Sequence, residues 1–197
     1  MKTLGWLIAA FALGLGVYLL SKRPVTVVGQ PLEMATLKPD GSPPPEAKIT
    51  VGDKSFNVKV EVERSGSDLI YHLTSNGQEI EQERYQFLNE EFHLAQAAGE
   101  TFHPPMKLLS QKVQVGSQWN WDGELRSGVL STKAMASINL LRDSAFAPSG
   151  EEGLKVSVVL TLNERNDTTR DLAFWFVRGR GVVQRRFGPA LRSPVAW

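Results

Sequence analysis

The sequence predicts an all-β fold, a curved antiparallel sheet built as a half-barrel or a sandwich, preceded by one N-terminal transmembrane helix. Three observations support this prediction. An uncharged apolar run covers residues 3–20, apolar and polar side chains alternate with a period of two from residue 47 onward, and short turn signals separate the alternating segments. The chain of 197 residues therefore divides into an anchor or signal segment at 1–23, a short first strand and proline-rich linker at 24–46, and one exported antiparallel β domain at 47–197.

The apolar run at residues 3–20 has the length of a membrane-spanning helix. At about 1.5 Å rise per residue, its 18 residues span roughly 27 Å, close to the ~30 Å hydrocarbon core of a bilayer. Trp6 and Tyr18 lie near its two ends, where aromatic rings prefer the membrane interface. We therefore expect residues 3–20 to anchor the chain in a membrane, with the C-terminal domain on the extracytoplasmic side.

A cleaved signal peptide is the alternative to a retained anchor, and the protein would then be secreted. Signal peptides carry small residues just before the cleavage site, whereas this run ends in Val17-Tyr18-Leu19-Leu20. The retained anchor is therefore the favoured interpretation. The chain has no cysteine, which excludes a lipidated cysteine and thiol catalysis.

The first half of the β domain reads as a series of hairpins. Residues 25–28 are apolar and β-branched and predict a short strand, and the prolines at 39–45 exclude a helix after it. Asn76-Gly77 is a strong signal for a tight hairpin turn. The strands predicted by alternation in this half are 47–51, 56–62, 69–73, 79–88 and 92–95.

Two prolines and two tryptophans mark the middle of the chain. Pro104 and Pro105 predict an interruption, because proline fits neither a helix interior nor a central strand. Trp119 and Trp121 alternate on one face of the strand that follows Gly116. The strands predicted after them are 132–141, 154–162, 171–177 and 182–187, which gives roughly nine to eleven strands in all and no helix after the anchor.

Two segments of the second half resemble exported bacterial β-sheet proteins of unassigned function. Pro104–Leu109 with Val115–Gly123 has the pattern PP-apolar followed by VG-x-x-W-x-x-x-G, and Phe174–Val183 has the pattern W-F-x-x-G-x-G-x-V. The resemblance implies a cell-envelope location and a curved sheet similar to the half-barrels of lipoprotein carriers. It implies no catalytic residue, and Arg178 and Arg180 depart from the small or apolar residues common at their positions.

The tryptophans of these motifs are the candidates for lining an apolar ligand site. Two interpretations are open: Trp119, Trp121 and Trp175 line a ligand, or the motifs are a fold signature in which glycines such as Gly116 and Gly181 permit turns and bulges. The fold signature is the favoured interpretation.

The charge is unevenly distributed along the chain. Residues 24–110 carry 7 basic and 13 acidic residues, and residues 111–197 carry 12 basic and 8 acidic residues. Opposite charges meeting within one fold would explain this simply. The other interpretation is a basic surface that faces anionic lipid or a partner, and its candidate residues are Arg178, Arg180, Arg185 and Arg186. Nucleic acid is not an expected partner, because few aromatic residues accompany these arginines.

No arrangement of catalytic or metal-binding residues is recognisable. His72, His93 and His103 lack metal-site spacing, and we expect His72 on a polar face. Glu79, Glu81 and Glu83 alternate along one strand and are interpreted as a solvated face rather than a pair of catalytic carboxylates. The sequence therefore predicts no metal, no cofactor and no catalytic residue, and an enzyme is the less favoured class.

These observations favour a membrane-anchored, non-catalytic domain of the cell envelope that serves as a binding or assembly module. The alternative is a protein that binds or transports a lipid or another apolar ligand, which needs a concave and partly empty sheet. An open apolar groove would favour the lipid carrier, and a filled core would favour the assembly module. The partner is a membrane through residues 3–20, together with an envelope protein or a lipid.

Overall fold

The computed structural model describes residues 32–33, 37, 47–143, 153–162, 168–188 and 191–192. Within these ranges the secondary structure consists of β-strands, without an α-helix. The strands of the first half are β1 (Leu32–Glu33), β2 (Ala47–Val51), β3 (Lys54–Ser65), β4 (Asp68–Ser75), β5 (Gln78–Leu88), β6 (Glu91–Ala97) and β7 (Glu100–Leu109). Those of the second half are β8 (Lys112–Val113), β9 (Gln118–Ser127), β10 (Leu130–Asp143), β11 (Gly153–Leu162), β12 (Thr168–Val177), β13 (Gly181–Phe187) and β14 (Leu191–Arg192).

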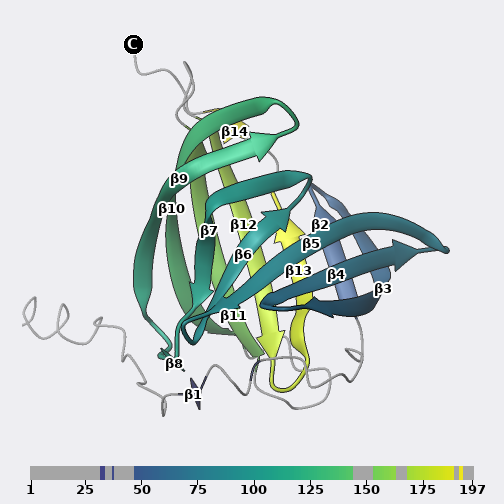
Figure 1. The fold of residues 1–197 in the computed structure, drawn as a ribbon, viewed down its shortest axis with the longest axis horizontal. Coiled ribbons are helices and arrows are strands. Elements are labelled where there is room, and N and C mark those ends of the chain that lie inside the picture. The colour runs from purple at the N-terminus through teal and green to yellow at the C-terminus, as the bar shows by residue number, and fades with distance from the viewer. Residues whose placement is uncertain are drawn as a thin grey trace, which may run out of the picture.

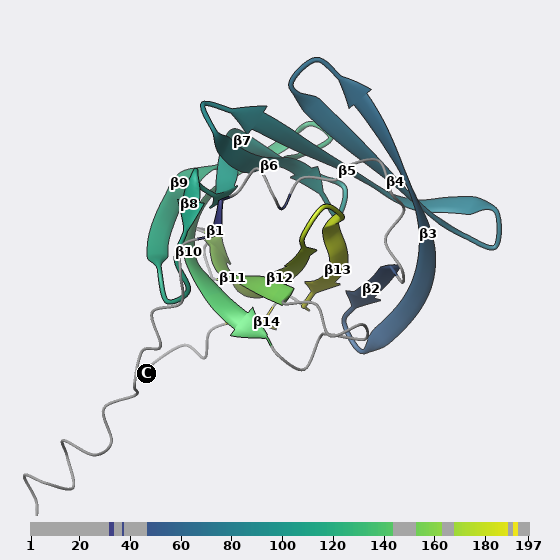
Figure 2. The same cartoon turned by 90° about the horizontal axis from the view of Figure 1, so that it is seen from below.

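Eleven of these strands close into a barrel (Figures 1 and 2). Successive strands pair antiparallel from β2 through β7, then β9, β10, β11, β12 and β13. The ring closes where β13 pairs with β2 in parallel, with Arg185 beside Ile49 and Phe187 beside Val51. The predicted all-β class is confirmed, but the sheet is neither a half-barrel nor a sandwich, because this last pairing joins its two ends.

The barrel has two ends, which we name by their contents. The pocket end carries the β2–β3 turn, the β6–β7 turn and the last residues of β13, and it points upward in Figure 1. The opposite end carries the β5–β6 and β12–β13 turns and the short β1–β8 pair. Because β2 runs parallel to β13, the chain enters the barrel at Ala47 from the opposite end.

The inner face of the barrel is filled by side chains. Alternation with a period of two directs one set of residues inward from each strand, as in β11, where Leu154, Val156, Val158, Leu160 and Leu162 are buried. The largest fully buried side chains are Arg185, Tyr71, Tyr85, Phe174, Phe176, Leu73, Leu94, Met106, Leu108, Leu109, Ile138 and Leu140. The inside is therefore mostly an apolar core that also contains an arginine.

A second, smaller apolar cluster consists of Ala173, Trp175, Val177 and Val183. These residues alternate along β12 and β13 with the core residues Phe174, Phe176 and Val182, so they belong to the outer face of the barrel wall.

The two prolines lie inside the bounds of β7, but neither has a partner in the ladder to a neighbouring strand. The predicted interruption at Pro104 and Pro105 is therefore present in the pairing of the strand, although the strand itself continues through them. On one side β7 pairs with β6 over Glu100–Thr101 and again within Met106–Leu109, with a register shift between the two stretches. On its other side β7 pairs with β9 only over Thr101–His103. Proline cannot donate a ladder hydrogen bond, so β7 is a barrel strand with a short ladder on one edge.

The predicted transmembrane helix at 3–20 and the predicted strand at 25–28 lie outside the described residues. Among the residues that the structure does describe, none forms a helix long and apolar enough to cross a bilayer.

Candidate functional site

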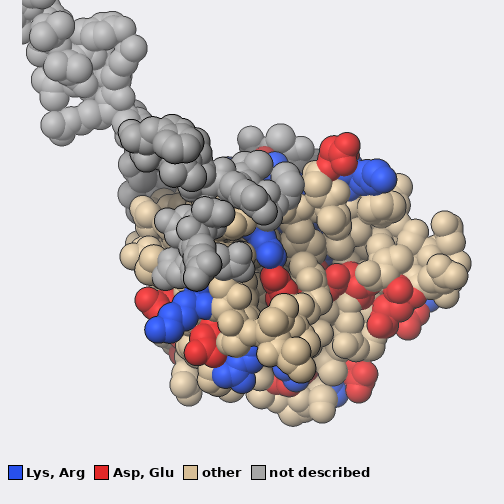
Figure 3. Space-filling model, turned by 90° about the horizontal axis from the view of Figure 1, so that it is seen from above, with Lys and Arg blue, Asp and Glu red and all other residues tan. Residues whose placement is uncertain are grey.

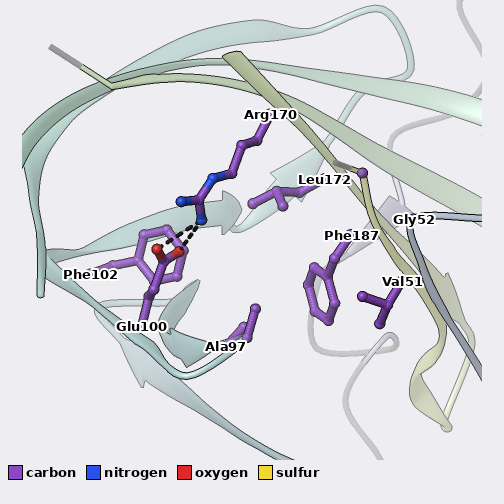
Figure 4. Close-up of a pocket in the computed structure, with 10 residues that line it drawn as sticks. Val51, Gly52, Ala97, Glu100, Phe102, Arg170, Leu172 and Phe187 are labelled. Atoms are coloured by element: carbon purple, nitrogen blue, oxygen red, sulfur yellow. Dashed lines mark hydrogen bonds and ion pairs between the residues drawn. The ribbon is translucent and has the colours of Figure 1, made fainter. Parts of the chain in front are cut away.

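A pocket of about 420 Å³ opens at the pocket end of the barrel (Figure 4). Most of its walls are apolar, and the two charged side chains among the lining residues come from β7 and β12. The lining residues are Val51, Gly52, Ala97, Ala98, Glu100, Phe102, Arg170, Leu172, Phe187 and Gly188. They belong to four separate parts of the chain, which the closure of the barrel brings together.

Close backbone packing positions the aromatic wall of the pocket. The amide of Gly188 donates to the Asp171 carbonyl at 2.7 Å, and the amide of Gly52 donates to the Phe187 carbonyl at 2.9 Å. A Cβ on Gly188 would lie 2.9 Å from that Asp171 oxygen, so a larger residue would push the end of β13 away from β12. These bonds hold Phe187 between β12 and the β2–β3 turn.

One ion pair spans the mouth of the barrel. Arg170 Nη1 lies 2.8 Å from both Glu100 carboxylate oxygens, and the two side chains retain 27% and 16% of their exposure. Glu100 begins β7 and Arg170 lies in β12, and three strands separate these two in the sheet order. The Nε of Arg170 is buried and donates to no described residue, so the pair leaves one donor unused.

A second ion pair lies inside the barrel. Arg185 and Glu83 are both fully buried, with Nη2 2.8 Å and Nε 3.2 Å from Glu83 Oε2, and Nε 2.9 Å from Oε1. The Tyr85 hydroxyl donates to Glu83 Oε2 at 2.8 Å. Arg185 precedes Phe187 by two residues on β13, so both side chains point into the barrel. The Glu83–Arg185 pair therefore lies deeper in the barrel than Phe187, which forms part of the pocket wall.

Burial also changes the titration of the tyrosines near that pair. Desolvation raises the pKa of Tyr71 to about 12 and, together with the negative charge of Glu83, raises the pKa of Tyr85 well above its usual range. Both phenols are therefore neutral at physiological pH. Tyr85 contacts the ion pair through its hydroxyl, and the Tyr71 ring centroid lies 5.9 Å from the guanidinium carbon of Arg185, so neither phenol acts as a base there.

The three glutamates of β5 have three different environments. The interpretation of Glu83 as part of a solvated face is wrong. Glu83 and Tyr85 are two residues apart on β5, so their side chains point to the same face of the strand, which is the inner face of the barrel. Glu81 accepts a hydrogen bond of 2.9 Å from the amide of Ala98, and burial raises the pKa of its carboxyl. Glu81 thus braces the β6–β7 turn, part of which lines the pocket.

Glu79, the third glutamate, contacts a histidine at the surface. His72 Nδ1 lies 2.6 Å from Glu79 Oε2, and this contact is the main cause of the raised pKa of His72. His72 therefore lies on the polar face, as predicted. Among the described residues, no group of three or more side chains is arranged to hold a metal ion.

The structure does not bring the three predicted tryptophans together. Trp119 Nε1 donates to the Lys107 carbonyl at 2.8 Å, and Trp121 Nε1 donates to the Pro104 carbonyl at 2.9 Å. The two indoles thus link β9 to β7 where the ladder between these strands has ended. This supports the interpretation of the PP and W-x-W motif as a fold signature.

Trp175 has a different role from the other two tryptophans. It belongs to the outer cluster, where Nε1 donates to Asp143 Oδ2 at 2.8 Å and Lys155 Nζ lies 5.2 Å from the ring centroid. None of the three tryptophans lines the pocket at the barrel end. A ligand-lining role for them stays a prediction.

The four predicted basic residues are also separated. The prediction that Arg185 faces a membrane or a partner is wrong, because its side chain is fully buried against Glu83. Arg178 and Arg180 lie in the β12–β13 turn at the opposite end, and Arg186 is exposed on β13 toward the pocket end. The sequence reasoning also missed Glu100 and Arg170, since no local pattern connects two residues 70 positions apart.

Comparison of the chain with protein-family models, with curated proteins and with solved structures gave no match.

Proposed function

We propose that the chain is a non-catalytic binding module of the cell envelope, anchored by residues 3–20, and that it binds an apolar group in the pocket at the barrel end. The pocket carries this proposal. Its volume of about 420 Å³ lies within the usual range for small-molecule sites, and such sites combine apolar walls with a few placed polar groups. Phe102, Leu172 and Phe187 supply the walls, and the Glu100–Arg170 pair supplies the polar groups.

The filled core limits what such a ligand can be. A carrier that encloses several acyl chains needs a wide interior, whereas large side chains occupy the inside of this barrel. The observations therefore favour one chain or ring held at the mouth of the barrel over a whole multi-chain lipid held within it. This combines the predicted binding module with a restricted form of the apolar-ligand alternative.

The positions of the chain segments suggest an orientation at the membrane. Leu32, in β1, lies at the opposite end of the barrel and follows the apolar run by 12 residues, which reach at most about 42 Å when extended. Arg178 and Arg180 lie at the same end. In this proposal the opposite end faces the anchoring membrane on its extracytoplasmic side, and the pocket opens away from it.

Photo-crosslinking of the full-length protein in lipid nanodiscs tests the proposal. A diazirine derivative of a C12 alkyl chain should label peptides that contain residues 97–102, 170–172 or 187–188. Val51, half-exposed at the pocket rim, can be replaced by Trp to fill the site, and Val51→Trp should lower this labelling roughly tenfold, a change of about 1.4 kcal/mol.

Val159→Trp is the matched control for this experiment. Val159 is a valine of similar exposure, and it lies on the outer face of β11, between the inward residues Val158 and Leu160. Labelling should be unchanged in this variant. Equal labelling of wild type and Val51→Trp, or labelling spread over the outer face of the barrel, would contradict the proposal.

A second candidate function, assembly with another envelope protein, is favoured by the tip of the β9–β10 hairpin. Val129 is fully exposed and Leu130 is 71% exposed, and these two adjacent aliphatic side chains offer an apolar contact of the kind that larger exposed patches provide at interaction sites. Formaldehyde crosslinking in cells, followed by purification, should recover a partner with wild type and lose it with Val129→Ser/Leu130→Ser. Recovery of the same partner with both proteins would refute this candidate.

A further inference from the structure

We infer that the ligand of the pocket carries a neutral polar head group that accepts a hydrogen bond, such as an alcohol or an ester, rather than a carboxylate, a phosphate or an amine. This inference rests on the proposed function and names the chemical class that the same site would take. Three observations carry it: the charge balance of the lining residues, the free donor on Arg170 and the volume of the pocket.

The charges of the lining residues cancel. Glu100 and Arg170 are the charged members of the lining set, and they are paired at 2.8 Å while mostly withdrawn from water. An anionic head group would have to displace Glu100 from Arg170 and leave a half-buried carboxylate unpaired, and an ammonium would have to displace Arg170 in the same way. Breaking a buried pair is costly because one charge loses its partner, whereas a neutral head group leaves the pair intact.

The charged residues around the pocket do not create an electrostatic potential that would offset the cost of breaking the Glu100–Arg170 pair. Glu81 lies behind the β6–β7 turn and adds a further carboxylate on the pocket side, which opposes an anion. Deeper in the barrel, Glu83 and Arg185 neutralise each other. On the described part of the face seen in Figure 3, acidic and basic side chains are interspersed rather than gathered by sign.

The guanidinium of Arg170 still has a hydrogen bond to give. Its Nη1 makes both bonds to Glu100, and its buried Nε has no partner among the described residues. Nε itself is too enclosed for a ligand to reach, but Nη2 of the same guanidinium is not among the buried unpaired atoms and has no hydrogen bond to a described residue. Nη2 can therefore donate to an acceptor oxygen brought by the ligand. In Figure 4 the Arg170 guanidinium lies with Glu100 and Phe102 on one side of the pocket, and Phe187 lies across from them.

The volume sets the size of the ligand. At about 30 Å³ per non-hydrogen atom, the share that a water molecule takes in the liquid, the pocket holds about 14 atoms within its volume of about 420 Å³. Dodecanol has this size and combines one apolar chain with one neutral oxygen. Dodecanoate and dodecylamine have nearly the same shape and differ in charge, so the three compounds isolate the effect of the head group.

Diazirine derivatives of these three compounds test the inference on the full-length protein in nanodiscs, each at the same mole fraction in the bilayer. In wild type, the dodecanol probe should label the pocket peptides about tenfold more than either charged probe. Glu100→Gln frees Arg170 and should raise labelling by the dodecanoate probe, and Arg170→Gln frees Glu100 and should raise labelling by the dodecylamine probe. Ratios between variants cancel the different partitioning of the probes.

Stronger labelling of wild type by either charged probe would overturn the inference and leave the proposed function standing. The comparison of the three probes on the wild-type protein requires no substitution. It therefore tests the inference even when a variant folds poorly. Absence of pocket labelling by all three probes, with Val51→Trp indistinguishable from wild type, would instead overturn the proposed function and this inference with it.

Discussion

The buried pair of Glu83 and Arg185 should be the most sensitive polar contact in the barrel. Glu83→Gln keeps the shape of the side chain and its hydrogen-bonding capacity but removes the negative charge. Arg185 is fully buried, and its guanidinium would then remain inside the barrel without a counter-charge. The Tyr85 hydroxyl would at the same time exchange a charged acceptor for a neutral one.

The expected loss of stability follows from this geometry. Removing one partner of a buried ion pair costs about 3–5 kcal/mol, because the remaining charge is uncompensated. With a urea dependence of about 2 kcal/mol per molar, the unfolding midpoint should fall by about 1.5–2.5 M. A triple variant that removes every partner together, Glu83→Leu with Tyr85→Phe and Arg185→Met, should instead be at least as stable as Glu83→Gln, since no buried charge is left over.

Urea unfolding of the full-length protein in a non-denaturing detergent, followed by tryptophan fluorescence, measures both effects. Trp119 and Trp121 are suitable reporters because they pack in or against the core. A midpoint shift below about 0.5 M for Glu83→Gln, equal to about 1 kcal/mol at the same urea dependence, would refute the description of the pair as buried and mutually dependent. A triple variant that is less stable than Glu83→Gln would refute it as well.

Three further predictions concern β7, β9 and the β4–β5 hairpin. Gly123→Ala should destabilise the fold by about 1–3 kcal/mol, because a Cβ there would overlap the Trp121 ring; an unchanged urea midpoint would contradict this packing. Trp121→Phe should lose about 1 kcal/mol from the hydrogen bond to Pro104 in addition to ring contacts, and a midpoint equal to wild type would show that this bond is dispensable. NMR titration should give His72 a pKa above 6.5, and Glu79→Gln should lower it. Since the pKa is raised by folding, the contact stabilises the fold fully below pH 6.5 and its contribution is lost as the pH rises through the raised value; a pKa unaffected by Glu79→Gln would exclude this contact as the cause.

The local pattern of the sequence predicts the strands and several turns well. Alternation identifies β3 and β11, and Asn76-Gly77 forms the expected tight turn with positive φ at both residues. The burial of Glu83 could also have been predicted, because alternation along the strand places its side chain on the same face as that of Tyr85. The acidic neighbours on the same strand suggested a solvated face instead.

Features that depend on closure of the barrel could not be predicted in this way. The pairing of β13 with β2 joins segments more than a hundred residues apart, and the sequence contains no local signal for it. The same closure places Arg170 beside Glu100 and Phe187 beside Val51, so the pocket was not predicted. The passage of β7 through Pro104 and Pro105 depends on indole donors that lie more than ten residues farther along the chain.

Methyl NMR of the full-length protein in nanodiscs tests the central claim, that the pocket at the barrel end is a ligand site. Addition of dodecanol should shift the methyl signals of Val51, Ala97 and Leu172, which line the pocket, and leave Val159 on the outer face of β11 and Ile138 in the filled core unchanged. Absence of shifts at the three pocket methyls, or larger shifts at Val159 than at Leu172, would contradict the claim.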